Sequence, residues 1–185
     1  MTKSNKDSLN KIKSEVASCT KCELHKTRLN TVFGEKDYNA RIMIIGEGPG
    51  ANEDKTGRPF VGRAGKLLDE VLFKYGLSRE KGVFITNIVK CRPPENRKPK
   101  KKEIECCLPY LKEQIRLINP RLIILLGLTA AKSYLGIDEQ MKNIRGEIIT
   151  VDGRNIMVTY HPAAILRNPN LRNFLEQDIH KASEL

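Results

Sequence analysis

Three short apolar runs, at residues 42–45, 83–86 and 122–126, most constrain the folds open to this chain. Runs of this length without alternating polar positions are typical of strands that are buried on both faces of a parallel sheet. After the first run, apolar residues from Leu67 to Tyr75 recur at helical spacing. Strands that alternate with helices predict an α/β sandwich with a mainly parallel sheet.

The two ends of the chain extend this pattern. Helical spacing near the N-terminus predicts an amphipathic helix that ends near the first cysteine. Asp152-Gly153 is a strong turn signal, and it predicts a hairpin that joins residues 147–151 to residues 155–159. We expect the second arm to be the last core strand, and a closing helix to follow from about Leu171.

The charge of the chain narrows the class of partner. Lys and Arg outnumber Asp and Glu by 33 to 22, which gives a formal charge of +11 and a pI near 9.5. This balance favours polyanions, above all nucleic acid. No apolar run approaches the roughly 20 residues that span a bilayer, and no secretion signal is visible. We expect one cytoplasmic domain, residues 1–185, that does not enter a membrane.

Polar residues stand where the expected strands end. Gly46, Glu47 and Gly48 follow the first strand, Asn87 follows the second, and His161 follows the last. Because ligands bind beyond the carboxyl ends of parallel strands, we expect these residues to share one site. The glycine-rich segment is neither a Walker loop nor a dinucleotide fingerprint, and a tight turn would explain its glycines alone. Glu47 weighs against that explanation, because a carboxylate buried at a strand end is costly without a partner or a role.

Five cysteines in a chain expected in the cytoplasm indicate metal binding or buried thiols rather than disulfides. Cys19 and Cys22 form a C-x-x-C pair, and Cys91 and Cys107 flank a basic loop. Helical periodicity favours Cys107 over Cys106, which would point about 100° away from it. A proline near the start of that helix weakens the argument. From spacing alone, an iron–sulfur cluster, a zinc ion and ordinary buried thiols all stay open.

Residues 90–102 carry seven positive charges and one negative charge. The segment predicts phosphate contacts, for which we name Arg92, Arg97 and Lys98. A solvated surface loop would explain the same composition. Basic side chains on a free loop lose conformational entropy when they are ordered against phosphate. If Cys91 bound a metal at the base of the loop, the loop would already be fixed, which favours a functional role.

A set of segments stands in a fixed order along nearly the whole chain: CxxC at 19–22, GEGPGANED at 46–54, GRPFVG at 57–62, TNIVKCRPP at 86–94, CLPYL at 107–111 and HPA at 161–163. The set resembles the family 4 uracil-DNA glycosylases of bacteria and archaea. This resemblance implies a three-layer α/β/α sandwich with a central, mainly parallel four-stranded sheet. It also implies a structural 4Fe-4S cluster held by Cys19, Cys22, Cys91 and Cys107, which leaves Cys106 to packing.

The activity implied by the resemblance is that of a monofunctional hydrolase. The enzyme would flip uracil out of DNA and hydrolyse its N-glycosidic bond, leaving an abasic site that starts base excision repair. The implied partner is uracil-containing single- and double-stranded DNA, with replication or repair proteins open as further partners and a monomer as the default state.

Base recognition can be matched to residue types. Phe60 is the family's stacking residue. Asn87 offers a donor and an acceptor, which suit O4 and N3–H of uracil and mismatch cytosine. Gly46 and Gly48 complete the expected substrate-binding set.

The chemical step needs a donor and an oriented water. Because negative charge develops on uracil O2, we expect His161 to donate a hydrogen bond there. Glu47 is expected to orient or deprotonate the attacking water. Glu53 and Asp54 are alternatives for that role, or caps for the following segment.

Beyond the pocket, Ile165 or Leu166 could fill the gap left by the flipped base while Arg167 meets a phosphate. A proline-bounded surface turn is the alternative. Residues 58–63 hold no histidine of the kind that traps DNA covalently in related glycosylases, so turnover is expected, and His25 and His180 receive no role. Two other readings remain: a metal-stabilised DNA-binding module without activity, and a redox protein.

Overall fold

The computed structural model describes residues 2–185, and its centre is one sheet with the strand order β1-β3-β2-β4-β6-β5. The four central strands run parallel, and each pairs in register with its neighbour. They are β3 (Val83–Asn87), β2 (Ile42–Gly46), β4 (Leu122–Leu126) and β6 (Arg154–Thr159). The four predicted core strands are therefore confirmed, and they leave their carboxyl ends at one edge of the sheet.

Antiparallel strands extend both edges of this sheet. β5 (Ile148–Val151) pairs with β6 through the predicted hairpin. Asp152 and Gly153 both have positive φ, at 49° and 72°, as a tight primed turn requires. The opposite edge, β1 (Glu35–Lys36), pairs with β3 and was not predicted. The sheet therefore has six strands around a parallel core of four.

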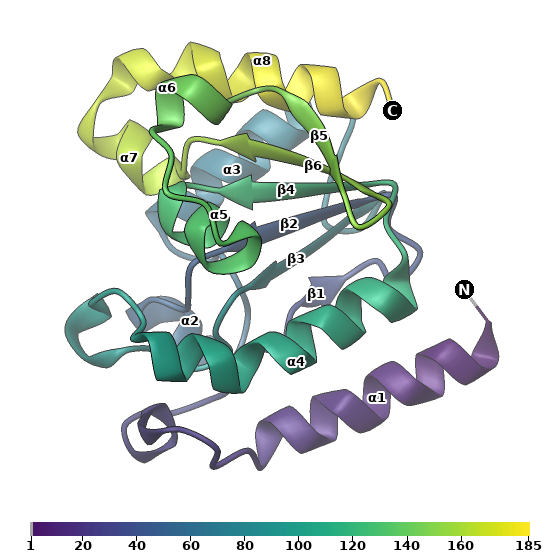
Figure 1. Ribbon diagram of the computed structural model, residues 1–185, viewed down its shortest axis with the longest axis vertical. Helices are drawn as coiled ribbons and strands as arrows, with labels where there is room; N and C mark the ends of the chain where they lie inside the picture. The colour runs from purple at the N-terminus through teal and green to yellow at the C-terminus, as the bar shows by residue number, and fades with distance from the viewer. Residues whose placement is uncertain (1) are drawn as a thin grey trace.

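Helices cover both faces of the sheet (Figure 1), which confirms the three-layer sandwich. One face carries α4 (Lys101–Ile118) and α5 (Leu128–Leu135), with α1 (Lys3–Ala17) packed against α4. The other carries α3 (Arg63–Lys74), α7 (Pro162–Arg167) and α8 (Arg172–Ser183). Alternate strand residues enter the two cores, so the central strands are apolar throughout.

Several local expectations need correction. α5 begins at Leu128 with Gly127 as its N-cap, and Thr129 lies inside the helix. Pro109 also lies inside a continuous α4 and does not move its start. The remaining short helices were not predicted: α2 (Ala51–Thr56), α6 (Met141–Ile144) and the 3-10 turns Glu23–Lys26, Pro94–Asn96 and Pro169–Leu171. Within residues 2–185, no helix is long and apolar enough to cross a membrane.

Candidate active site and cysteine cavity

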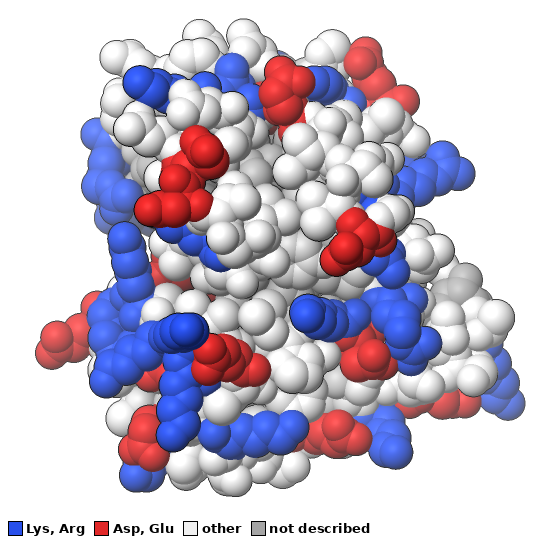
Figure 2. Space-filling model, viewed as in Figure 1, with Lys and Arg blue, Asp and Glu red and all other residues white. Residues whose placement is uncertain are grey.

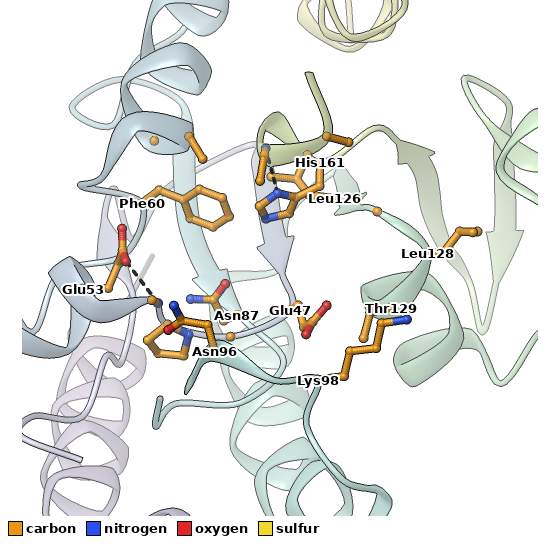
Figure 3. Close-up of a pocket in the computed structure, with 18 of the residues that line it drawn as sticks. Glu47, Glu53, Phe60, Asn87, Asn96, Lys98, Leu126, Leu128, Thr129 and His161 are labelled. Atoms are coloured by element: carbon orange, nitrogen blue, oxygen red, sulfur yellow. Dashed lines mark hydrogen bonds between the residues drawn. The ribbon is translucent and has the colours of Figure 1, made fainter. Parts of the chain in front are cut away.

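A cavity of about 660 Å³ opens beyond the carboxyl ends of the parallel strands. Its size is typical of ligand sites. Most of the predicted site residues line it: Glu47, Gly48, Phe60, Asn87, Arg97, Lys98, His161 and Arg167. Figure 3 shows the Phe60 ring, the His161 imidazole and the Asn87 amide around one space, with Glu47 beside them. Glu47, Asn87 and His161, which the sequence placed at the ends of strands, therefore line one cavity as expected.

Asn87 presents an unused acceptor in this cavity. It is 1% exposed, and its Oδ1 atom is buried without a hydrogen-bond partner among the described residues. A Cβ atom at Gly46 would lie 2.5 Å from this Oδ1 and 2.5 Å from Cζ of Phe60. Gly46 therefore lies behind the cavity and lets the amide and the ring approach each other. A buried acceptor without a partner is costly, so the site is built for a ligand that brings a donor.

Phe60 has a left-handed backbone, with φ of 52°, which is strained for an aromatic residue. Two side chains hold this turn. Oε1 of Glu53 accepts from the amides of Val61 and Gly62, at 2.9 Å each. Arg79 donates to the carbonyl of Pro59 at 2.6 Å and to that of Phe60. The turn thus presents the Phe60 ring to His161, with ring centroids 5.5 Å apart.

His161 is neutral at physiological pH. Burial, aided by the charge of Arg167, lowers the pKa of its imidazole to about 4. Its Nδ1 accepts the amide hydrogen of Ala163 at 3.1 Å, as the N-cap of α7. Because Nδ1 is an acceptor in this bond, the ring hydrogen is on Nε2. The imidazole therefore offers one neutral N–H donor.

The three candidate carboxylates have different surroundings. Asp54 is buried and accepts from the amides of Leu29 and Asn30, at 2.9 and 3.3 Å. Glu53 is committed to the backbone, accepting from Gly50 at 3.1 Å in addition to the Phe60 turn. Glu47 lines the cavity half-buried, and its carboxylate accepts no hydrogen bond from another described residue. Of the three, Glu47 has the oxygens most available to a water.

Two arginines of the basic loop already bond to other residues of this protein. Arg97 forms a two-pronged ion pair with Glu103, at 2.9 and 2.7 Å, and Arg92 donates to Asn96 at 2.8 Å. Lys98 is exposed at the rim of the cavity. Lys and Arg side chains gather at the lower left of Figure 2, where the loop meets the start of α4. A cationic rim is thus present, although Arg97 is anchored within it.

The predicted wedge needs correction. Ile165 is 2% exposed and packs against the sheet with α3 and α8, so it cannot enter DNA. Leu166, one position along α7, is 44% exposed. Successive helical residues differ by about 100° in direction, which separates the buried side chain from the exposed one. Arg167 lies on the cavity rim.

A second, small cavity is lined by all four predicted metal ligands, Cys19, Cys22, Cys91 and Cys107. Cys106 lines it too, and its Sγ contacts the carbonyl of Lys21 at 3.3 Å. Within residues 2–185, no three His, Cys, Asp or Glu side chains are arranged to bind one metal ion.

Two N–H donors contact the sulfurs of this cavity. Arg28 donates to Sγ of Cys91 at 3.2 Å, and the backbone of Lys90 donates to Sγ of Cys107 at 3.2 Å. Burial raises the pKa of the Cys107 thiol to about 11. A metal centre bound by these sulfurs would need the thiols to be deprotonated.

Two residues with clear roles in this geometry were missed from the sequence. Arg79 lies between α3 and β3 and outside every motif, and it acts on backbone carbonyls, which leave no trace in a sequence pattern. Lys90 was counted with the basic loop but is 1% exposed, so it cannot contact phosphate.

A family model and several known proteins are similar to most of this chain. The family model described as the uracil DNA glycosylase superfamily matches residues 33–181. A type-4 uracil-DNA glycosylase of Sulfurisphaera tokodaii is 50% identical over 97% of this chain and 85% of its own length. Proteins of the same name from Pyrobaculum aerophilum and Thermotoga maritima are each 46% identical, over 92% of this chain and 91% of their own lengths.

Proposed function

The chain belongs to the uracil DNA glycosylase superfamily, and we propose that it removes uracil from DNA. It hydrolyses the N-glycosidic bond, releases the free base and leaves an abasic site, the first step of base excision repair. The observation that carries this proposal is the buried, unpartnered Oδ1 of Asn87 in a cavity shared with Phe60 and His161. Uracil in a duplex must be flipped out to reach such a cavity.

Recognition rests on complementary hydrogen bonds. The Oδ1 atom of Asn87 accepts N3–H of uracil, and its amide N–H group donates to O4. Cytosine has no hydrogen at N3 and carries an amino group in place of O4. It would therefore place an acceptor against Oδ1 of Asn87 and a donor against its amide N–H group. Phe60 stacks on the base, and its clamped turn fixes the ring before the base arrives.

His161 and Glu47 serve the two charges that develop as the bond breaks. The Nε2–H of His161 donates to O2 as uracil leaves with negative charge. A neutral imidazole suits this role, because it stabilises charge without transferring a proton. Glu47 orients the attacking water and opposes the positive character of the sugar.

DNA contacts come from both sides of the cavity. Lys98 reaches phosphate from the loop before α4, and Arg167 does so from α7. Arg92, at the start of the same loop, is a further phosphate contact. Leu166 fills the space left by the flipped nucleotide. The monomeric state and the cytoplasmic location predicted from the sequence remain part of this proposal.

We further propose that Cys19, Cys22, Cys91 and Cys107 hold a 4Fe-4S cluster. Four thiols from three segments line one cavity, and two sulfurs already accept N–H bonds of the kind that tune cluster sulfurs. Each iron of such a cluster takes one cysteine, so the sulfurs need to surround a shared space rather than converge on one ion. When bound, the cluster supplies cross-links between the N-terminal segment, the loop after β3 and α4.

The proposed activity is tested with matched oligonucleotides that carry one uracil or one thymine. The purified protein is added without metal or nucleotide, and alkali then reveals abasic sites as strand breaks. We expect breaks in the uracil strand alone, and their loss in Asn87→Ala and His161→Ala. His180→Ala, at an exposed histidine outside the cavity, is the matched control. Absence of breaks from protein with an intact cluster would refute the enzyme and favour the DNA-binding module.

A further inference from the structure

Lys90 is a buried lysine whose side chain and backbone donate hydrogen bonds in two directions. It is 1% exposed, and no described carboxylate pairs with it. Its Nζ donates to the backbone carbonyl of Asn87 at 2.7 Å and to Oγ1 of Thr86 at 2.6 Å. Its own backbone N–H donates to Sγ of Cys107 at 3.2 Å. One residue therefore contacts both the cysteine cavity and the residue that carries the unused acceptor of the base pocket.

The surroundings leave this side chain little freedom. The carbonyl of Lys90 accepts from the amide of Val32 at 2.7 Å. Thr86 donates to the carbonyl of Phe33 at 2.9 Å, and Gln114 of α4 donates to the same carbonyl at 2.8 Å. Thr86 and Gln114 are fully buried. Because the side chain cannot rotate freely, a shift of the Lys90 backbone would therefore also move its Nζ.

The bond from Nζ of Lys90 holds the backbone of Asn87, the residue whose side-chain amide faces the base pocket. Asn87 is the last residue of β3. The peptide plane beyond it is held from two sides, because the amide of Ile88 donates to the carbonyl of Gly46 at 2.9 Å and Nζ of Lys90 donates to the carbonyl of Asn87. These two bonds together fix the backbone from which the Asn87 side chain projects. Because Oδ1 has no hydrogen-bond partner within residues 2–185, its position depends on the backbone that carries it.

We propose that Lys90 is a positioning residue that links the cysteine cavity to uracil recognition. The bond to Cys107 holds the backbone of Lys90, and its side-chain nitrogen holds the carbonyl of Asn87. An ordered cysteine cavity thereby directs the Asn87 amide at the base. This inference rests on the proposed function, including the metal centre. A lysine that only stabilised the fold would leave the preference for uracil unchanged.

The test measures binding rather than turnover. Two oligonucleotides carry either uracil or thymine on a sugar with a 2′-fluorine, which prevents glycosidic hydrolysis. The ratio of their dissociation constants reports base recognition in the folded protein. Iron content and thermal midpoint are measured on each variant, so that loss of the metal centre or of the fold is seen directly.

Lys90→Met keeps the length of the side chain and removes its donors. We expect the preference for uracil over thymine to fall about 10- to 100-fold, with unchanged affinity for the thymine strand. Thr159→Val removes an equally buried hydroxyl, which bonds to Asp178 and contacts neither Lys90 nor Asn87, and its preference should stay within about threefold of wild type. Equal preference in Lys90→Met and wild type would overturn the role of Lys90.

Two further comparisons keep the proposal testable if Lys90→Met does not fold. Thr86→Val removes one acceptor of Nζ in nearly the same volume, and it should lower the preference for uracil several-fold; no loss would contradict the proposal. Cys107→Ser and Cys19→Ser each remove one thiol, but only Cys107 contacts Lys90. A greater loss of preference in Cys107→Ser supports the link, and equal losses refute it. Failure of the wild type to release uracil would refute the proposed function instead.

Discussion

Gly46→Ala tests how closely the base pocket is packed. The added Cβ would lie 2.5 Å from both Oδ1 of Asn87 and Cζ of Phe60. Ordinary contact begins near 3.4 Å, so the amide and the ring would have to separate from the methyl group by roughly 1 Å. A displacement of that size at reacting groups costs on the order of 100-fold in rate. Overpacking also lowers stability by about 1–3 kcal/mol.

The assay is single-turnover release of uracil from a DNA strand, combined with urea denaturation. Gly136→Ala is the matched control, because Gly136 has a φ of 69° and a Cβ there would meet nothing within 4 Å. That substitution strains the backbone by about 1–2 kcal/mol but leaves the pocket intact, so uracil release should stay normal. A folded Gly46→Ala protein with a rate within about threefold of wild type would refute the packing argument.

Three further predictions concern His161, Arg79 and the cationic rim. Since the pKa of His161 is about 4 when folded and near 6.5 when unfolded, stability should fall between pH 6.5 and 4, by up to about 3 kcal/mol. His161→Gln should remove that dependence in urea titrations, and uracil release by wild type should show no ionisation of His161 above pH 5. Arg79→Lys keeps the charge but loses the fork that holds two carbonyls, so kcat should fall about tenfold with little change in KM; an unchanged kcat would contradict the clamp. Lys98→Ala and Arg167→Ala should each reduce the salt dependence of DNA binding by about 0.9 in log–log slope, and an unchanged slope would remove that residue from the interface.

The parallel core could be predicted because burial on both faces leaves an almost uniformly apolar run in the sequence. β1 could not, because Glu35 and Lys36 carry no such pattern and form a strand only by pairing with β3. The segment from Pro162 was interpreted as a wedge, with a proline-bounded surface turn as the alternative, and the helix α7 was not predicted. In the structure that proline occupies the first helical turn, where it costs no hydrogen bond, and His161 caps the helix.

The site was predictable to the extent that strand ends define it. Glu47, Asn87 and His161 follow strands that the sequence identifies, and topology alone brings them to one edge. The choice between Ile165 and Leu166 depended on the rotation of a short helix, which two adjacent apolar residues do not reveal. Lys90 looked like part of a charged loop, and only the folded chain shows that its side chain returns into the core.

The most direct test of the account measures free uracil itself. Wild type and Asn87→Ala are mixed in excess with strands that carry one uracil or one cytosine, and the released base is quantified over time. Wild type should release uracil and no cytosine. Asn87→Ala should be at least about 100-fold slower while binding uracil-free DNA within about threefold of wild type. Equal rates for the two proteins, or no release by wild type, would contradict the assignment of this pocket to uracil excision.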